Sequence, residues 1–253
     1  MDAGETPEGA MTTLGLQHAR TRPVQQTTAR TETRVRAALL VCGILSSLVY
    51  AAMLVVVPAA WAGYSSASQT VSELSAVGAP TRSFWIWLAG LYTLLVALFG
   101  CGVVAAGQRS RALHGVGYAM IAYAILGLFW PPMHLRGVER TLVDTLHIAF
   151  TVATVVLMAA AIGLGATAFG RRFRLYSYAT LGVLLGFGVL TGMDAPRVAA
   201  NLPTPWAGVW ERIAIGAFLL WVAVTAIALL RGGPQADRAN AVSTRSEIDS
   251  RVT

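Results

Sequence analysis

The sequence has no lysine and few charged residues of either sign. Only 12% of its 253 residues are charged, and all nineteen basic residues are arginine. Most of the arginines flank apolar segments instead of forming one basic face, so the net charge of +7 does not indicate a nucleic acid partner. Because 55% of the residues are hydrophobic, the composition excludes an ordinary soluble domain and predicts a membrane protein.

Cysteine is almost absent, and the short motifs of common enzymes are missing. Cys42 and Cys101 both lie in apolar segments, which excludes a disulfide framework and a CxxC metal motif. The sequence contains no phosphate-binding loop, no GxGxxG, no HExxH and no GxSxG. The spacing of His134 and His147 matches no common zinc motif. We therefore expect neither a cofactor nor a metal ion.

Both ends of the chain lack the aliphatic and aromatic side chains that offset the entropy of ordering. We predict disordered cytoplasmic tails over residues 1–36 and 232–253, on either side of a six-span domain over 37–231. The first apolar segment begins late and is longer than the apolar region of a signal peptide. A cleaved secretory signal is therefore not expected.

Six apolar segments are candidates for membrane spans, because a bilayer core about 30 Å thick needs roughly 20 helical residues. They cover approximately 37–60, 83–107, 115–130, 147–169, 176–193 and 213–230. The fold class predicted from them is an all-α, polytopic membrane helical bundle. The middles of the spans lack Asp, Glu, Arg and His, which makes an ion-coupled or proton-coupled transporter less favoured. In the fifth span the small residues predict close helix packing; they are Gly182, Gly186, Gly188 and Gly192.

Arginine placement predicts the orientation of the spans. Two short connections carry arginines without any acid, namely Arg109, Arg111, Arg171, Arg172 and Arg174. The other connections balance each arginine with a carboxylate. Since arginine-rich loops stay in the cytoplasm, we predict that both termini are cytoplasmic and that the protein lies in a bacterial plasma (inner) membrane. Six of the seven tryptophans lie near the opposite, outer ends of the spans, where indole rings favour the membrane interface.

The first outer loop, Tyr64 to Pro80, concentrates hydroxyl and carboxylate groups. Thr70 and Glu73 have the spacing of a capping box, and Val71, Leu74 and Val77 have that of a short amphipathic helix that packs on the bundle. The alternative interpretation gives Ser72 or Glu73 a role in a site.

The second outer region, Phe129 to His147, contains the two histidines. Thr141 and Asp144 form a plausible cap of the fourth span, and His147 follows Asp144 by three residues on the same helix face. An aspartate that orients a histidine is typical of a general base. Two interpretations remain open: Asp144 is a helix cap and the histidines are hydrogen-bonded spacers, or His134, Asp144 and His147 act together in catalysis.

The third outer loop leads into the last span. Thr204 as helix cap and Pro205 as first helical residue predict where that helix begins. Glu211 and Arg212 are adjacent on the helix and do not face each other, so they need partners from other loops. The available partners are Glu73, Arg136, Arg140 and Asp144.

Several of these short sequences resemble one family. The segments "SQTVSELSAVGAPTR", "PMHLR", "DTLH" and "GVWERI" resemble the bacterial and archaeal membrane proteins grouped as domain of unknown function 998, over about Ala38 to Arg231. The resemblance implies a six-span helical protein with characteristic outer loops, and it implies no particular activity. A fainter likeness of the first loop to six-span eukaryotic proteins of lipid-anchor handling favours a lipid-facing role.

These patterns lead to two functional hypotheses. In the first, the outer loops form a polar pocket that binds or processes a lipid or other amphiphile. Arg136 and Arg212 would bind its head group, with Glu73 and Glu211 beside them. A reaction there would use His147 as general base, His134 as second acid or base, and Ser72 or water as nucleophile. In the second hypothesis the protein is a non-enzymatic structural or accessory membrane protein whose loops form a lid.

Overall fold

The structure is a computed structural model that describes residues 8–107 and 110–232, with side chains from residue 30 onward. Its elements in chain order are α1 (Glu8–Ala59), the 3-10 helix η1 (Val71–Ser75), α2 (Arg82–Ala106), α3 (Arg111–Leu128), α4 (Leu142–Ala168), α5 (Arg171–Ala199) and α6 (Ala207–Leu230). The described residues form no β-strand, and their one β-type contact is a single bridge between Val77 and His134. The predicted all-α fold class is confirmed.

Each of the six α-helices contains a segment that is long and apolar enough to cross a membrane. In α1 this segment is Arg30–Ala59, and in α2 to α6 it is the whole helix. The protein is therefore a multi-pass membrane protein with six helices capable of spanning a bilayer, as predicted.

Several helices extend beyond the predicted spans, and α5 does so at both of its ends. Its predicted span ended at 193, whereas the helix continues to Ala199 with Pro196 in its last turn. A proline near a helix end removes a single backbone hydrogen bond. Similarly, α1 begins at Glu8 and residues 30–36 are helical, inside the segment assigned to a disordered tail. Residues 1–7 and 233–253 lie outside the described residues, and the disorder of both tails stays a prediction.

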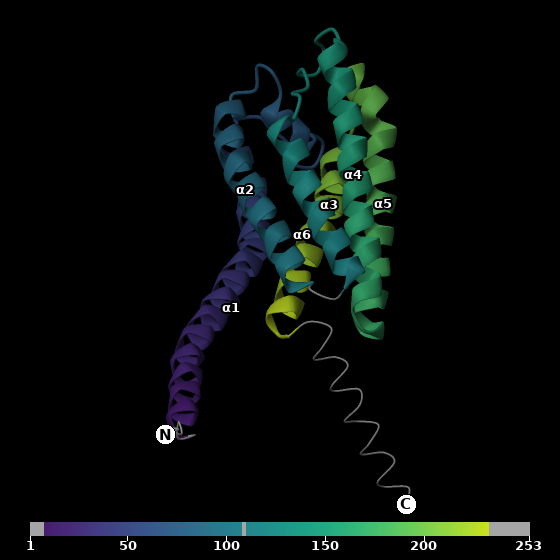
Figure 1. The fold of residues 1–253 in the computed structure, drawn as a ribbon. Helices are drawn as coiled ribbons and strands as arrows, with labels where there is room; N and C mark the ends of the chain where they lie inside the picture. Colours follow the sequence, from purple (N-terminus) through teal and green to yellow (C-terminus); the bar gives the residue numbers. More distant parts are fainter. Residues whose placement is uncertain (1–7, 108–109, 233–253) are drawn as a thin grey trace, which may run out of the picture.

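The six α-helices form a closed bundle in which chain neighbours pack side by side and α6 contacts α1 (Figure 1). The helices alternate in direction, so α1 begins and α6 ends at the same end of the bundle. The opposite end carries the first loop (60–81), the second loop (129–141) and the third loop (200–206). We call it the loop end. That the loop end faces away from the cytoplasm stays a prediction.

The centre of the bundle is built around the aromatic side chains of α6. Trp221 and Phe218 are almost completely buried, and their rings stack with centroids 6.4 Å apart. The indole N–H of Trp221 donates to the hydroxyl of Ser177 on α5 at 3.0 Å, which satisfies its polar group inside the apolar core. This core holds α6 between its neighbours and fixes the position of its first turn at the loop end.

Close helix approach depends on glycines other than the predicted ones. A Cβ atom on Gly100 or Gly117 would contact the backbone of the facing helix, and one on Gly165 would meet Trp221. By contrast, a Cβ added to any of the four α5 glycines would meet nothing within 4 Å; these are Gly182, Gly186, Gly188 and Gly192. Their predicted role in packing within the bundle was wrong, because α5 contacts its neighbours through the face that carries Ser177, Thr180 and Leu184.

Candidate functional site

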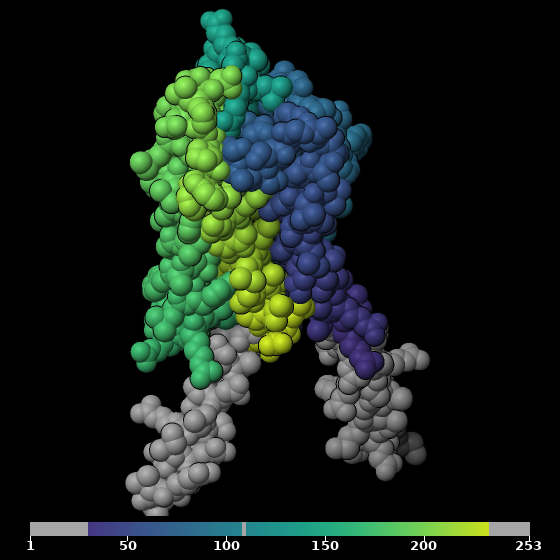
Figure 2. All heavy atoms as spheres, turned by 180° about the vertical axis from the view of Figure 1, so that it is seen from behind, coloured from purple at the N-terminus to yellow at the C-terminus, as the bar shows by residue number. Residues whose placement is uncertain are grey.

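The first loop folds back over the loop end of the bundle. In Figure 2 it lies against the beginning of α6, with the second loop above it. Leu74 is completely buried, which confirms the apolar contact predicted for it. Val77 is 41% exposed, because η1 ends at Ser75 and Val77 no longer shares its face. The backbone N–H of Val77 instead donates to the carbonyl of Met133 at 2.8 Å and joins the first loop to the second.

A buried ion pair joins all three loops. Arg136 donates from Nε and Nη2 to the two carboxylate oxygens of Glu73, at 2.6 and 2.9 Å. Its other hydrogen bonds go to the carbonyls of Ser68 and Leu202 and to the hydroxyl of Thr204. A guanidinium has five N–H donors, so this set occupies all of them. Glu73 also closes the predicted capping box with Thr70 and is fully buried.

The first turn of α6 is held by carbonyl groups of the first loop. Thr204 does not cap this helix: α6 begins two residues after Pro205, and the Thr204 hydroxyl donates to the carbonyl of Ser68 at 2.8 Å. The free amides of Gly208 and Val209 are satisfied by the carbonyl of Ala67, at 2.9 and 3.2 Å. The predicted cap was wrong because a backbone acceptor from a distant loop replaces a local side chain.

Gly208 and Arg212 make this contact between α6 and the first loop possible. A Cβ on Gly208 would collide with the carbonyls of Ser66 and Gln69, so only glycine permits the approach. Arg212 donates from Nη1 to these same two carbonyls and from Nη2 to the hydroxyl of Tyr64 at 2.8 Å. Burial raises the pKa of Tyr64 to about 12, so this hydroxyl stays neutral. Arg212 is therefore engaged by the protein itself, like Arg136.

The carboxylate of Glu211 holds the beginning of η1. It accepts a short hydrogen bond from the backbone N–H of Val71 and a longer one, at 3.3 Å, from the hydroxyl of Ser72. Three ion pairs join described residues, namely Arg136 with Glu73, His134 with Asp144, and Arg197 with Asp194, and Glu211 belongs to none of them. Glu211 is thus a half-buried carboxylate outside every ion pair between described residues.

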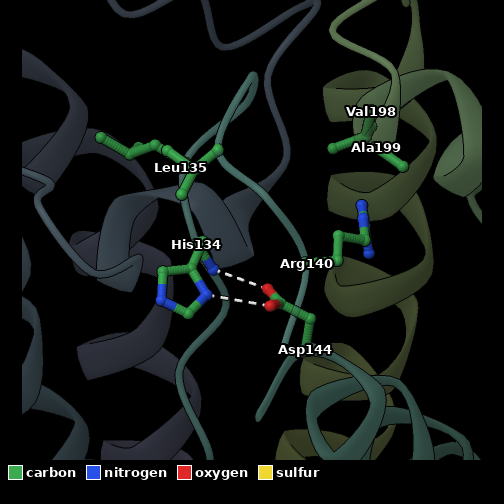
Figure 3. Close-up of a pocket in the computed structure, with 7 residues that line it drawn as sticks. His134, Leu135, Arg140, Asp144, Val198 and Ala199 are labelled. Carbon is green, nitrogen blue, oxygen red and sulfur yellow. Dashed lines mark hydrogen bonds and ion pairs between the residues drawn. The ribbon is translucent and has the colours of Figure 1, made fainter. Parts of the chain in front are cut away.

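Asp144 pairs with His134 and not with His147. Its two oxygens accept from the backbone N–H and from Nδ1 of His134, at 2.8 and 2.9 Å, as Figure 3 shows. The same carboxylate completes the predicted capping box with Thr141 at the start of α4. His147 instead donates from Nδ1 to the carbonyl of Pro131 at 2.8 Å. The predicted partnership was wrong because the second loop folds back and presents His134 to the capping carboxylate.

The predicted catalytic residues do not converge on one cavity. The space next to His134 and Asp144 has a volume of about 10 Å³, which is the size of a single water molecule. His147 packs edge-on against Trp130, with ring centroids 5.2 Å apart. Ser72 has Glu211 as its hydroxyl partner and contacts neither histidine. Asp144 and His134 therefore form a pair, while Ser72 and His147 lie in separate surroundings.

A larger cavity lies beneath η1 and has a volume of about 340 Å³. One part of its lining is polar and contains Ser72, Ser75, Arg82 and Glu211. Five aromatic side chains also line the cavity; they are Tyr50, Trp85, Tyr92, Tyr123 and Trp130. Most of the other lining residues are apolar or glycine and lie on α2 and α3, among them Ile86, Gly90 and Leu128. Sequence reasoning missed Arg82 and these aromatic residues, although the tryptophans had been placed at this end of the spans.

The cavity opens on the surface that a bilayer covers. Ile86 and Gly90 of α2 and Leu128 of α3 line it and are themselves exposed, with Leu128 at 69%. Exposed apolar residues on a membrane-spanning helix face lipid. The opening between α2 and α3 is therefore lateral, toward acyl chains. Among the described residues, no cluster of three or more His, Cys, Asp or Glu side chains could hold a metal ion.

The fold and the loop end together define the class of protein: it is a six-span helical membrane protein with a lateral cavity. A buried polar network joins its three loops at the same end of the bundle. A family model described as "Protein of unknown function (DUF998)" matches residues 44–228. Because this match covers well over half of the chain, the protein belongs to that family, as the resemblance predicted. No match was found among curated proteins or among solved structures.

Proposed function

We propose that the protein binds a membrane amphiphile in the cavity of about 340 Å³ between η1, α2 and α3. The observation that carries this proposal is the polarity of the lining: charged and hydroxyl groups at one part, and apolar residues at an opening that faces lipid. A volume of this size is typical of small-molecule sites. It accommodates a head group and the first part of the acyl chains, which leave through the opening.

The proposed head-group position differs from the one expected from sequence. Arg136 and Arg212 were expected to bind the head group, but the guanidinium of Arg136 has all its donors occupied by the protein. Displacing Glu73 from it would leave a buried carboxylate unpaired, which costs several kcal/mol. Ser72, Ser75, Arg82 and Glu211 line the cavity and are the better candidates.

The proposal concerns binding and not catalysis. His134 and Asp144 do not belong to the lining of the cavity, and no histidine contacts Ser72. We place the protein in a bacterial plasma membrane with the loop end outside and both termini in the cytoplasm. The arginines near the other end support this orientation, because positively charged segments stay in the cytoplasm.

The experiment purifies the wild-type protein and two variants in a mild detergent and compares the lipids that copurify with each, as identified by mass spectrometry. Gly90 lies in the lining, and a Cβ there meets nothing within 4 Å, so Gly90→Phe fills the opening without a clash. Gly186→Phe on α5 is the matched control, because its surroundings are equally open and it is remote from the lining. We expect the copurifying amphiphile to fall about tenfold in Gly90→Phe only.

The same experiment tests the accessory hypothesis. If all three proteins retain the same lipids in the same amounts, the cavity is not a binding site. The saturated hydrogen bonds of Arg136 then favour a structural protein whose loops serve as a lid.

A further inference from the structure

The lining of the cavity contains one positively charged residue and one negatively charged residue. Among the described residues that line it, only Arg82 and Glu211 are charged. Neither takes part in any ion pair between described residues. Charges removed from water are normally paired, because an isolated buried charge is costly. The cavity thus presents one carboxylate and one guanidinium, neither of which belongs to an ion pair between described residues.

The helix η1 sets the spacing between these two groups. The hydroxyl of Ser72 donates to Glu211, and the carbonyl of Ser75 accepts from Nη1 of Arg82 at 2.6 Å. Residues three apart in a 3-10 helix share one face and are separated by about 6 Å along its axis. Glu211 therefore contacts η1 at the side chain of Ser72 and Arg82 contacts it at the carbonyl of Ser75, so η1 holds the two charged groups at positions three residues apart.

The free donors of Arg82 and the aromatic rings of the lining favour two chemically different groups of a ligand. Among the described residues the guanidinium of Arg82 donates only to the carbonyl of Ser75, which leaves donors free for a phosphate, and arginine binds phosphate in a bidentate way. Tyr50 lines the cavity within electrostatic range of Glu211, and its ring packs edge-on against Trp85 with centroids 5.8 Å apart. Aromatic faces beside a carboxylate favour an ammonium group.

We infer that the ligand is a zwitterionic phospholipid, with its ammonium group at Glu211 and its phosphate at Arg82. This inference rests on the proposed function, since it names the ligand class of the same cavity. The unlike charges of such a head group are joined by a few bonds, which suits two opposite charges held by one short helix at positions three residues apart. An anionic phospholipid supplies the phosphate but leaves the Glu211 carboxylate without a partner.

The test titrates the purified protein in a nonionic detergent with phosphatidylethanolamine, phosphatidylglycerol and diacylglycerol of identical acyl chains, with native mass spectrometry as readout. We expect phosphatidylethanolamine to bind about tenfold more tightly than phosphatidylglycerol. Glu211→Gln keeps an acceptor for the Val71 amide and should abolish this preference. Arg82→Gln should weaken binding of both phospholipids and leave diacylglycerol unchanged.

The outcomes separate the two proposals. If wild-type protein binds phosphatidylglycerol as tightly as phosphatidylethanolamine, or if Glu211→Gln retains the preference, the zwitterionic assignment is overturned. The proposed function survives that result as long as Gly90→Phe abolishes binding. If Gly90→Phe binds every lipid as well as wild type does, both proposals fall. The wild-type comparison needs no variant, so it decides even if Glu211→Gln does not fold.

Discussion

Replacing Arg136 with methionine is expected to destabilise the protein more than any other single surface-loop substitution. The change leaves the Glu73 carboxylate fully buried without a cation, with only the neutral hydrogen bonds of its capping box and of the Gln69 side chain. Breaking a buried ion pair by removing one partner costs about 3–5 kcal/mol. For a chain of this size each kcal/mol shifts the melting temperature by about 2–4 °C, so we expect a decrease of roughly 6–20 °C in detergent.

The double variant Glu73→Gln/Arg136→Met gives the more specific result. It removes the uncompensated charge together with its partner, so it should be more stable than Arg136→Met alone. Arg197→Met is the matched control, because Arg197 is 52% exposed and approaches Asp194 only to 4.0 Å. An exposed pair of this kind contributes about 0–1 kcal/mol. Thermal unfolding followed by tryptophan fluorescence measures all three variants, and a melting temperature of Arg136→Met equal to that of the control would refute the reasoning.

Three further outcomes follow from the loop end. Gly208→Ala should lower the free energy of unfolding by about 1–3 kcal/mol, because the added methyl group meets the carbonyls of Ser66 and Gln69. The control Gly186→Ala should leave the free energy of unfolding unchanged or raise it by up to about 1 kcal/mol. Equal melting temperatures for the two variants would contradict the close approach at Gly208. Asp144→Ala removes both the cap of α4 and the contact with His134, so it should lower the free energy of unfolding by about 2–4 kcal/mol. His134→Ala removes only the contact and should lower it by less. Chemical denaturation of both variants measures the difference, and equal decreases would mean that the cap contributes nothing to stability. In a background without Cys42 and Cys101, cysteines at Ala67 and Glu139 should react with an impermeant thiol reagent in intact cells, and one at Gly170 should not; the reverse pattern would overturn the proposed orientation.

Local patterns predicted the parts of the structure that depend on a few consecutive residues. Hydropathy identified all six spans, because crossing a bilayer requires an uninterrupted apolar helix. Both predicted capping boxes, Thr70 with Glu73 and Thr141 with Asp144, are present, since their geometry is set within four residues. The helix ends were predicted less well, because polar residues such as Asp194 continue a helix as easily as they begin a loop.

The site required information that a single sequence does not contain. The partner of Asp144 depends on how the second loop folds back, and sequence spacing favoured His147 because it counted only neighbours on the same helix. The α5 glycines have a pattern typical of helix packing, but the face on which they lie is decided by the rest of the bundle. The cavity involves Glu211 on the last helix and Arg82 on the second, and nothing in the local sequence of either residue links them.

The contact between the first loop and α6 has a consequence for how the chain is made. Ser66, Ala67 and Gln69 emerge from the ribosome long before α6, yet their carbonyls accept hydrogen bonds from N–H groups of that last span. Until α6 is inserted, the amide of Val71 also lacks the Glu211 carboxylate. We therefore expect the loop end to assemble last during biogenesis, and a nascent chain that stops before α6 to expose an unfinished first loop to quality-control proteases.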